Sequence, residues 1–225
     1  MIRTIDFLLA FTAILFLLPI FIIIIPILRL TGEGEIFYFQ ERYGLLGNKF
    51  NILKFATMKK NSPNLDGGML TVENDPRILP IGHFLRASKI NELPQIINIL
   101  IGDMSIIGPR PLTEEIISYY DLESKKQILS TRPGLSGIGS IVFRNEQEML
   151  SDVTNRHQFY SNEIAPYKKD LEIWYVQNKS LFLNLKLILF TVSAVLIKSS
   201  KLHWKFLKNL PIPPDAIKSK IGYPK

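Results

Sequence analysis

The feature that most constrains this fold is an uncharged apolar run near the N-terminus. The stretch FLLAFTAILFLLPIFIIIIPIL, from Phe7 to Leu28, spans 22 residues without a charged side chain. A helix of that length can cross the hydrocarbon core of a bilayer. A cleaved signal peptide is a poor interpretation, because the run is too long and no small-residue cleavage site follows it. The chain is therefore expected to associate with a membrane.

Prolines within this run leave two membrane topologies open. Pro19 lacks a backbone N–H and clashes with the preceding turn, so a kink or break is expected near Leu18. A broken helix can dip into the bilayer and return to the same face, whereas a straight one crosses it. Arg3 and Arg29 flank the two ends, and positive flanks favour the cytoplasmic side. This slightly favours the re-entrant form.

The basic character of the chain is concentrated at its C-terminal end. The net charge is +7, but the segment from Lys179 onward holds nine lysines and one acid, Asp215. The preceding residues are therefore nearly neutral, which argues against a basic nucleic-acid platform, and no nucleic-acid partner is expected. The sequence contains no cysteine, which excludes disulfides and a cysteine nucleophile.

Local composition predicts an α+β chain of four segments. These are a re-entrant membrane helix at 1–30, a small mixed cytoplasmic domain with short strands at 31–178, interfacial amphipathic helices at 179–210, and a mobile tail at 211–225. Apolar residues followed by lysines suggest that the third segment lies in the membrane interface. The alternative is a core helix with a solvated basic end.

Within the mixed domain, several elements are expected from local pattern. Residues 35–44 and 44–58 resemble two strands joined by a turn. Residues 61–68 have the composition of a loop, and 131–140 that of a glycine-rich turn. Residues 111–129 read as one helix, with acids early and lysines late.

The segment SKINELPQIINILIGDMSIIGPRPL, residues 88–112, carries the polar groups of most interest. Its apolar residues at helical spacing are Leu93, Ile96, Ile97, Leu100 and Ile101. Pro94 suits the first turn of a short helix and Gly102 the position after its end. Asn91 and Glu92 would then lie at the start of this helix, where its dipole favours an ionised carboxylate. Glu92 could also be merely a dipole partner.

Two proline-stiffened turns present arginines. The sequence GPRP at 108–111 forms a rigid extended turn around Arg110, and RPG repeats the device at Arg132. A guanidinium held this way suits a phosphate oxyanion, although a structural arginine at a helix end is the alternative. Polar clusters around one short helix, on a membrane-attached domain, suggest a phosphorylated substrate at the membrane surface.

These motifs together resemble a known family. INELPQIINILIGDMSIIGPRPL resembles the central signature of bacterial sugar transferases, the monotopic phosphoglycosyl transferases. QERYGLLGNKFNILKFATM, NDPRILPIGHFLR, TRPGLSG and DLEIWYVQNKSLFLNLKLILFTV are similar to further family segments, in the same order. The resemblance covers almost the whole chain and implies a re-entrant helix broken at Pro19, with a catalytic domain on the cytoplasmic face of the bacterial inner membrane.

The resemblance also implies a reaction and a site. The family transfers a sugar-1-phosphate from a UDP-sugar to undecaprenyl phosphate and releases UMP, using Mg²⁺ and an Asp-Glu dyad. The predicted catalytic residues are Glu92, Asn91 and Asp103, with Glu92 and Asp103 as metal ligands. The predicted substrate-binding residues are Lys54, Arg77, Arg86, Arg110, Arg132 and Arg144. Membrane lipids are expected partners, and a homodimer is compatible with the pattern.

The main departure from the family is at the dyad, whose aspartate is Asn91 here. An amide is neither a useful nucleophile nor a strong metal ligand. Three accounts stay open. Glu92 acts as the nucleophile, with Asp103 helping to bind metal; undecaprenyl phosphate attacks directly; or the chain is a catalytically silent member that binds lipid or acts as a scaffold.

Overall fold

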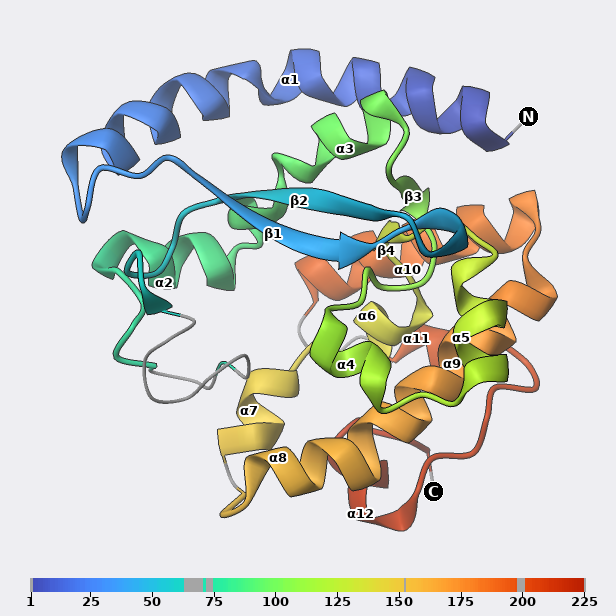
Figure 1. The fold of residues 1–225 in the computed structure, drawn as a ribbon. Coiled ribbons are helices and arrows are strands. Elements are labelled where there is room, and N and C mark those ends of the chain that lie inside the picture. The colour runs from blue at the N-terminus through green and yellow to red at the C-terminus, as the bar shows by residue number, and fades with distance from the viewer. Residues whose placement is uncertain (1, 63–70, 72–74, 152, 198–200, 225) are drawn as a thin grey trace. The chain divides into compact units, whose positions relative to one another are not determined.

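The computed structural model describes residues 2–62, 71, 75–151, 153–197 and 201–224, and Figure 1 shows its elements. The chain forms two compact units. Unit 1 comprises Met1–Glu41 and Asn51–Asp103, and unit 2 comprises Arg42–Phe50 and Met104–Lys225. This mixed architecture, with a long apolar N-terminal helix and small sheets, agrees with the predicted fold class. The boundaries of the four predicted segments stay predictions.

Unit 1 contains the N-terminal helix and a strand pair. Its elements are α1 (Ile2–Leu30), α2 (Pro80–Ala87), the 3-10 helix η3 (Ile90–Glu92), α3 (Gln95–Ile101) and most of strands β1 (Phe37–Tyr43) and β2 (Lys49–Phe55). The two strands pair in a two-stranded sheet. The short 3-10 helix η1 (Leu45–Gly47) connects them. The predicted strands and turn are therefore confirmed, whereas 63–68 of the predicted loop lie outside the described residues.

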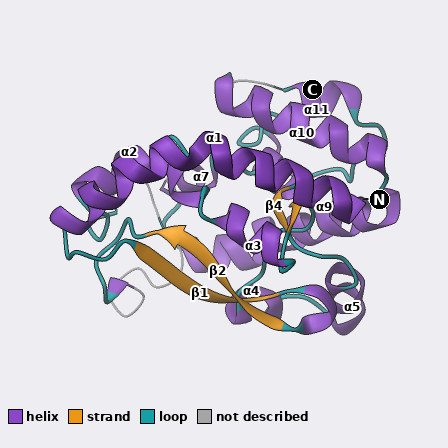
Figure 2. Cartoon of the chain, turned by 90° about the horizontal axis from the view of Figure 1, so that it is seen from above, coloured by secondary structure: helices purple, strands orange, loops and turns teal. Residues whose placement is uncertain are grey.

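Helix α1 runs without interruption through both of its prolines, Pro19 and Pro26. The secondary structure therefore shows no break near Leu18, and the alternative of a kink there stays a prediction. A proline removes one intrahelical hydrogen bond but leaves its neighbours free to stay helical, and here packing supports the helix. Its C-terminal half belongs to a buried cluster of Ile24, Leu28, Phe55 and Leu85. Helix α1 also packs against α3, which lies beside it in Figure 2.

The short helix α3 begins and ends as predicted. Pro94 occupies its N-cap position, and Gly102 ends it with a φ of 105°, a left-handed value that glycine adopts without strain. Its predicted apolar face is only partly right. Ile99 is fully buried, whereas Ile101 is 68% exposed. The reason is that polar contacts of Asn98, described below, rotate the buried face of α3 toward β2.

Unit 2 is mostly helical. Its elements are β3 (Ser105–Ile107), α4 (Glu114–Ser118), α5 (Leu122–Leu129), β4 (Gly134–Ser136), α6 (Ile138–Val142), α7 (Glu146–Ser151), α8 (Arg156–Phe159), the π-helical turn η4 (Tyr160–Ile164), α9 (Ala165–Asn178), α10 (Leu181–Leu196), α11 (Leu202–Phe206) and α12 (Asp215–Lys218). Strands β3 and β4 pair in parallel, with Ser105 opposite Gly134 and Ile107 opposite Ser136. Neither of these short strands was predicted.

Two expectations for unit 2 are wrong. The single helix predicted at 111–129 is two helices, α4 and α5, because the Asp121 carboxylate accepts the backbone N–H of Ser124 and starts a second helix. The predicted mobile tail at 211–225 contains α12, whose Ile217 is fully buried. The Tyr167 hydroxyl also donates to the Pro211 carbonyl at 2.9 Å. Apolar burial and this hydrogen bond hold the tail on unit 2.

Candidate active site

Asn91 and Glu92 lie in η3, directly before α3, as the sequence predicts. The backbone turns sharply before them, because Lys89 has a φ of 62°. Such a left-handed value is uncommon for a residue with a side chain. The turn joins the end of α2 to η3, and α2 and η3 pack together. The dyad position therefore lies in a short helical turn that packs against α2.

The Glu92 carboxylate is paired with a lysine of the neighbouring strand. Lys54 on β2 donates from Nζ to Glu92 Oε1 at 3.3 Å, and the side chains are 17% and 23% exposed. Arg86 on α2 lies close enough to be charge-coupled to Glu92. Burial lowers the pKa of the Arg86 guanidinium, and the carboxylates of Glu92 and Asp75 oppose that shift. The structure thus gathers three of the predicted residues, two cations and one anion, within unit 1.

Asn91 is buried beside this charge cluster. Its side chain is 7% exposed, and its Oδ1 atom has no hydrogen-bond partner among the described residues. Arg86 Nε is likewise buried without such a partner in the described part of the chain. Buried polar atoms are normally satisfied, and exceptions are frequent at functional sites. Two such atoms therefore lie at the predicted dyad and its neighbouring helix.

Asp103 is not brought to the dyad. It follows the C-cap of α3, whereas Glu92 precedes its N-terminus, and the seven-residue helix rises about 10 Å between them. Its carboxylate instead accepts from Asn98 Nδ2 at 3.4 Å. A single Mg²⁺ ion has oxygen ligands at about 2.1 Å, so one ion cannot bind both acids in this arrangement. The predicted catalytic and metal-binding roles of Asp103 stay predictions, and a shared ion with Glu92 would require a different arrangement of the two acids.

Asn98 explains how α3 is fixed against the strand that carries Lys54. Its Oδ1 accepts the backbone N–H of Leu53 at 3.0 Å, and its Nδ2 donates to the Asn51 carbonyl at 2.9 Å. The side chain is 3% exposed. Because one amide bridges two backbone groups of β2, the helix after Glu92 and the strand with Lys54 keep a fixed register. A polar residue within an apolar helix was the one sequence signal for this clamp.

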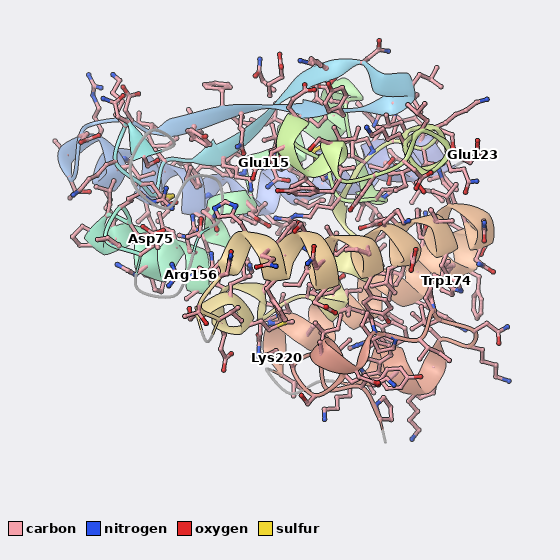
Figure 3. All side chains as sticks on the ribbon, turned by 60° about the horizontal axis from the view of Figure 1, so that its bottom comes forward. Asp75, Glu115, Glu123, Arg156, Trp174 and Lys220 are labelled. Carbon is pink, nitrogen blue, oxygen red and sulfur yellow. The ribbon has the colours of Figure 1, made fainter. Side chains whose placement is uncertain are left out.

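The Arg77 guanidinium makes several contacts within unit 1. Its guanidinium binds Asp75 through Nε at 2.9 Å and Nη2 at 2.6 Å, and Nη1 donates to the Ser62 carbonyl at 2.9 Å. Both side chains of the ion pair are 4% exposed. Asp75, labelled in Figure 3, lies beside α2. Arg77 therefore holds the chain that leads into α2, and its predicted substrate-binding role stays a prediction.

In unit 2, the two proline-stiffened turns pack directly against each other. The Gly108 N–H donates to the Ser136 carbonyl at 3.0 Å, and the Gly134 N–H donates to the Pro109 carbonyl at 2.8 Å. A side chain at Gly134 would place its Cβ only 2.1 Å from the Gly108 nitrogen, so glycine is required at this crossing. The turns that carry Arg110 and Arg132 are thus one rigid element. Their predicted phosphate-binding roles stay predictions.

Arg144, another predicted substrate ligand, follows α6 in unit 2. Its Nη2 atom donates to the Val195 carbonyl, near the end of α10, at 3.5 Å. Burial lowers the pKa of its guanidinium. This long contact ties the α6–α7 connection to α10, and the substrate-binding role stays a prediction.

Glu172 on α9 is a residue that the sequence interpretation missed. Its side chain is 2% exposed, its Oε1 accepts the Arg110 backbone N–H at 3.3 Å, and its Oε2 has no hydrogen-bond partner in the described chain. Burial raises the pKa of its carboxyl to about 7, against the opposing effects of the Arg110 N–H and the positive charge of Lys168. Lys168, one turn earlier, binds Glu146 at 2.7 Å. The only sequence signal was an acid in the apolar run DLEIWYV.

The raised pKa of Glu172 predicts a pH-dependent stability. A carboxyl whose folded-state pKa lies above its unfolded value of 4.5 stabilises the fold below pH 4.5 and loses that contribution as pH rises through about 7. Glu172→Gln, which stays neutral, should remove most of a loss of about 3 kcal/mol between pH 5 and 8. Denaturant unfolding in detergent micelles at both pH values measures it. Glu123→Gln on α5, labelled in Figure 3, is the surface control and should keep the wild-type pH dependence.

Comparison with known proteins agrees with this geometry. The sequence profile of the family described as bacterial sugar transferase matches residues 1–198. The chain belongs to this family. The matched region runs from α1 to the end of α10, and it includes the η3 dyad position with Lys54 and Arg86 and both arginine turns.

Individual relatives cover most of the chain. The exopolysaccharide production protein ExoY of Sinorhizobium fredii is 33% identical over 86% of this chain and 84% of its own length. The uncharacterized sugar transferase EpsL of Bacillus subtilis is 35% identical over 83% of this chain and 84% of its own length. The UDP-glucose:undecaprenyl-phosphate glucose-1-phosphate transferase of Escherichia coli is 32% identical over 84% of this chain but only 39% of its own length.

Proposed function

We propose that this sugar transferase moves a sugar-1-phosphate from a UDP-sugar to undecaprenyl phosphate and releases UMP, as the first membrane step of polysaccharide assembly. The observation that carries the proposal is the charge cluster of Lys54, Arg86 and Glu92 beside buried Asn91. Phosphoryl transfer depends chiefly on positioning and charge neutralisation, which such a cluster supplies. The reaction named for the Escherichia coli relative is of this type.

The residues present favour direct transfer between the two substrates. Asn91 cannot act as a nucleophile, and Glu92 is held in an ion pair with Lys54. We propose that an oxygen of the lipid phosphate attacks the β-phosphorus of the UDP-sugar. The bond from that phosphorus to the bridging oxygen breaks, and UMP leaves with the bonding electrons. The product is a lipid diphosphate sugar, and no covalent enzyme intermediate forms.

In this proposal the two cations bind the diphosphate. The Arg86 guanidinium would bind two phosphate oxygens as a planar fork, and the Lys54 ammonium would neutralise them as a point charge. Glu92 keeps Lys54 oriented through the 3.3 Å contact. The buried Asn91 amide can orient the transferred group by hydrogen bonding without competing as a nucleophile.

The residues at this site fit a Mg²⁺ ion that is held jointly by the protein and the substrate phosphates, rather than by the protein alone. Protein Mg²⁺ sites commonly use one or two carboxylates together with substrate phosphates. Glu92 offers a carboxylate and Asn91 Oδ1 an adjacent oxygen. Within the described ranges, no group of three or more acidic, histidine or cysteine side chains forms a closed metal site. When bound, the ion would withdraw charge from the transferred phosphoryl group.

We also propose that both ends of α1 lie on one face of the membrane, the cytoplasmic face of the inner membrane. In the described residues, α1 is the one helix long and apolar enough to cross a membrane. Its 29 residues extend about 43 Å. Arg3 at one end contacts α3, and Leu28 at the other end belongs to the buried cluster with Phe55 and Leu85. A helix that crossed the bilayer would carry those ends to opposite faces.

Helix α10 supplies a second surface for the membrane interface. Its exposed apolar residues are Phe182, Leu185, Leu189, Val192 and Val195, each at least 47% exposed. Their spacing places them on one side of the helix. Such an apolar stripe, followed by a lysine-rich segment, suits a bilayer surface with anionic headgroups. A homodimer stays a prediction.

The test is transfer of labelled phosphate into lipid. UDP-sugars labelled with ³²P in the β-phosphate are incubated with undecaprenyl phosphate, Mg²⁺ and the purified chain in nanodiscs. We expect label in the lipid fraction for at least one UDP-sugar. Lipid binding without any label transfer across the panel would favour a silent lipid-binding or scaffold member instead.

A further inference from the structure

Arg3 does more than place a positive charge at the end of α1. Its Nη2 atom donates to the Leu100 carbonyl at 2.9 Å, and its Nη1 atom donates to the Ile99 carbonyl. These carbonyls belong to the last turn of α3, where intrahelical partners are lacking. A cation there also interacts favourably with the helix dipole. The N-terminus of the membrane helix therefore caps the helix that follows Glu92.

The surrounding packing makes this contact specific. Asp6 and Ala10 lie on the same side of α1 as Arg3, and their side chains are only 5% and 1% exposed. Helix α1 packs against α3. Gly102 leaves room for the guanidinium, because a Cβ at that position would lie 3.3 Å from Arg3 Nη2. The arginine thus fills a site shaped by the end of α3.

We propose that Arg3 is a positioning residue that couples the membrane helix to the catalytic dyad position. Helix α3 is fixed on one side by the Asn98 clamp to β2 and on the other by Arg3 of α1. Only seven residues separate the capped end from Pro94 and the η3 turn. Without the Arg3 contacts, the C-terminal end of α3 is no longer held, and Glu92 can move relative to Lys54. This inference rests on the proposed function for its kinetic part.

The variants are chosen to separate the two-carbonyl contact from charge. Arg3→Met removes both. Arg3→Lys keeps the charge but replaces the planar fork by one ammonium. Arg29→Met is the matched control, because it removes the same residue type from the other end of α1, where Arg29 donates to the Gly34 carbonyl at 3.0 Å.

Hydrogen exchange in nanodiscs provides a readout that does not need activity. In Arg3→Met, the amides of η3 and α3 should exchange at least about tenfold faster than in the native chain, while those of α9 stay unchanged. Arg29→Met should leave α3 within about threefold of the native rate, and Arg3→Lys should be intermediate. Equal α3 exchange in Arg3→Met and Arg29→Met would overturn the proposal, as would native exchange in Arg3→Lys or a general increase that includes α9.

UMP release adds the kinetic signature of misplacement. Arg3→Met should lower kcat about tenfold or more while KM for the UDP-sugar changes less than threefold, because substrate binding by Lys54 and Arg86 persists. A changed KM with native kcat would contradict a positioning role. A native chain that releases no UMP would refute the proposed function, and the exchange result would still decide the role of Arg3.

Discussion

Replacing Glu92 by glutamine is expected to lower the rate of UMP release by about 1,000-fold. The change removes the carboxylate that pairs with Lys54 at 3.3 Å and balances the charge of Arg86. Loss of one preorganised electrostatic group at a reacting centre commonly has an effect of about 100- to 1,000-fold. Initial rates of UMP formation at saturating UDP-sugar and undecaprenyl phosphate measure it directly.

The matched variant is Asn91→Asp, which restores the carboxylate of the family dyad. It is expected to stay active, because the position is buried beside the same cations. Unfolding curves of both variants should coincide with that of the native chain within about 1 kcal/mol. Glu92→Gln with more than a tenth of native activity would show that the reacting centre lies elsewhere.

Asp75→Asn is expected to destabilise the chain by about 3 kcal/mol. The carboxylate holds the buried Arg77 guanidinium through two hydrogen bonds, and Arg77 also ties back to the Ser62 carbonyl. Removing one partner leaves a buried cation without its counter-charge, which is much more costly than losing an exposed pair. Denaturant unfolding in micelles gives the change in free energy.

Glu35→Gln provides the control for that prediction. It also converts an ion-paired acid to an amide in unit 1, but the Glu35–Lys60 pair is exposed. Its unfolding curve should overlap that of the native chain, since exposed pairs contribute little. If Asp75→Asn also left the free energy of unfolding unchanged, the Asp75–Arg77 pair would not stabilise the fold. Binding of substrate would then be the better explanation of Arg77.

Local signals were sufficient to predict the frame of the site. Pro94 and Gly102 mark the ends of α3 because each acts through its own backbone. The strands β1 and β2 follow from aromatic and β-branched content over a few residues. The apolar run predicts α1 by length alone. The local pattern overstates the disruption of the helix at Pro19, because packing against residues distant in sequence offsets the free-energy cost of this proline.

The parts that were not predicted depend on residues distant in sequence. The Asn98 clamp joins positions about 45 residues apart, and the Arg3 cap joins positions nearly 100 apart. Arg77 resembles a substrate ligand in sequence, because only the fold shows that Asp75 and a carbonyl already occupy its donors. Asp103 was grouped with Glu92 by motif, whereas the rise of α3 separates them.

The most direct test of the central claim is UMP release by the native chain from a UDP-sugar with Mg²⁺, measured with and without undecaprenyl phosphate. Direct transfer predicts steady UMP release only when the lipid phosphate is present. A burst of about one UMP per chain without lipid phosphate would contradict direct transfer and indicate a covalent intermediate. Absence of UMP in both reactions, across a panel of UDP-sugars, would contradict the proposed activity itself.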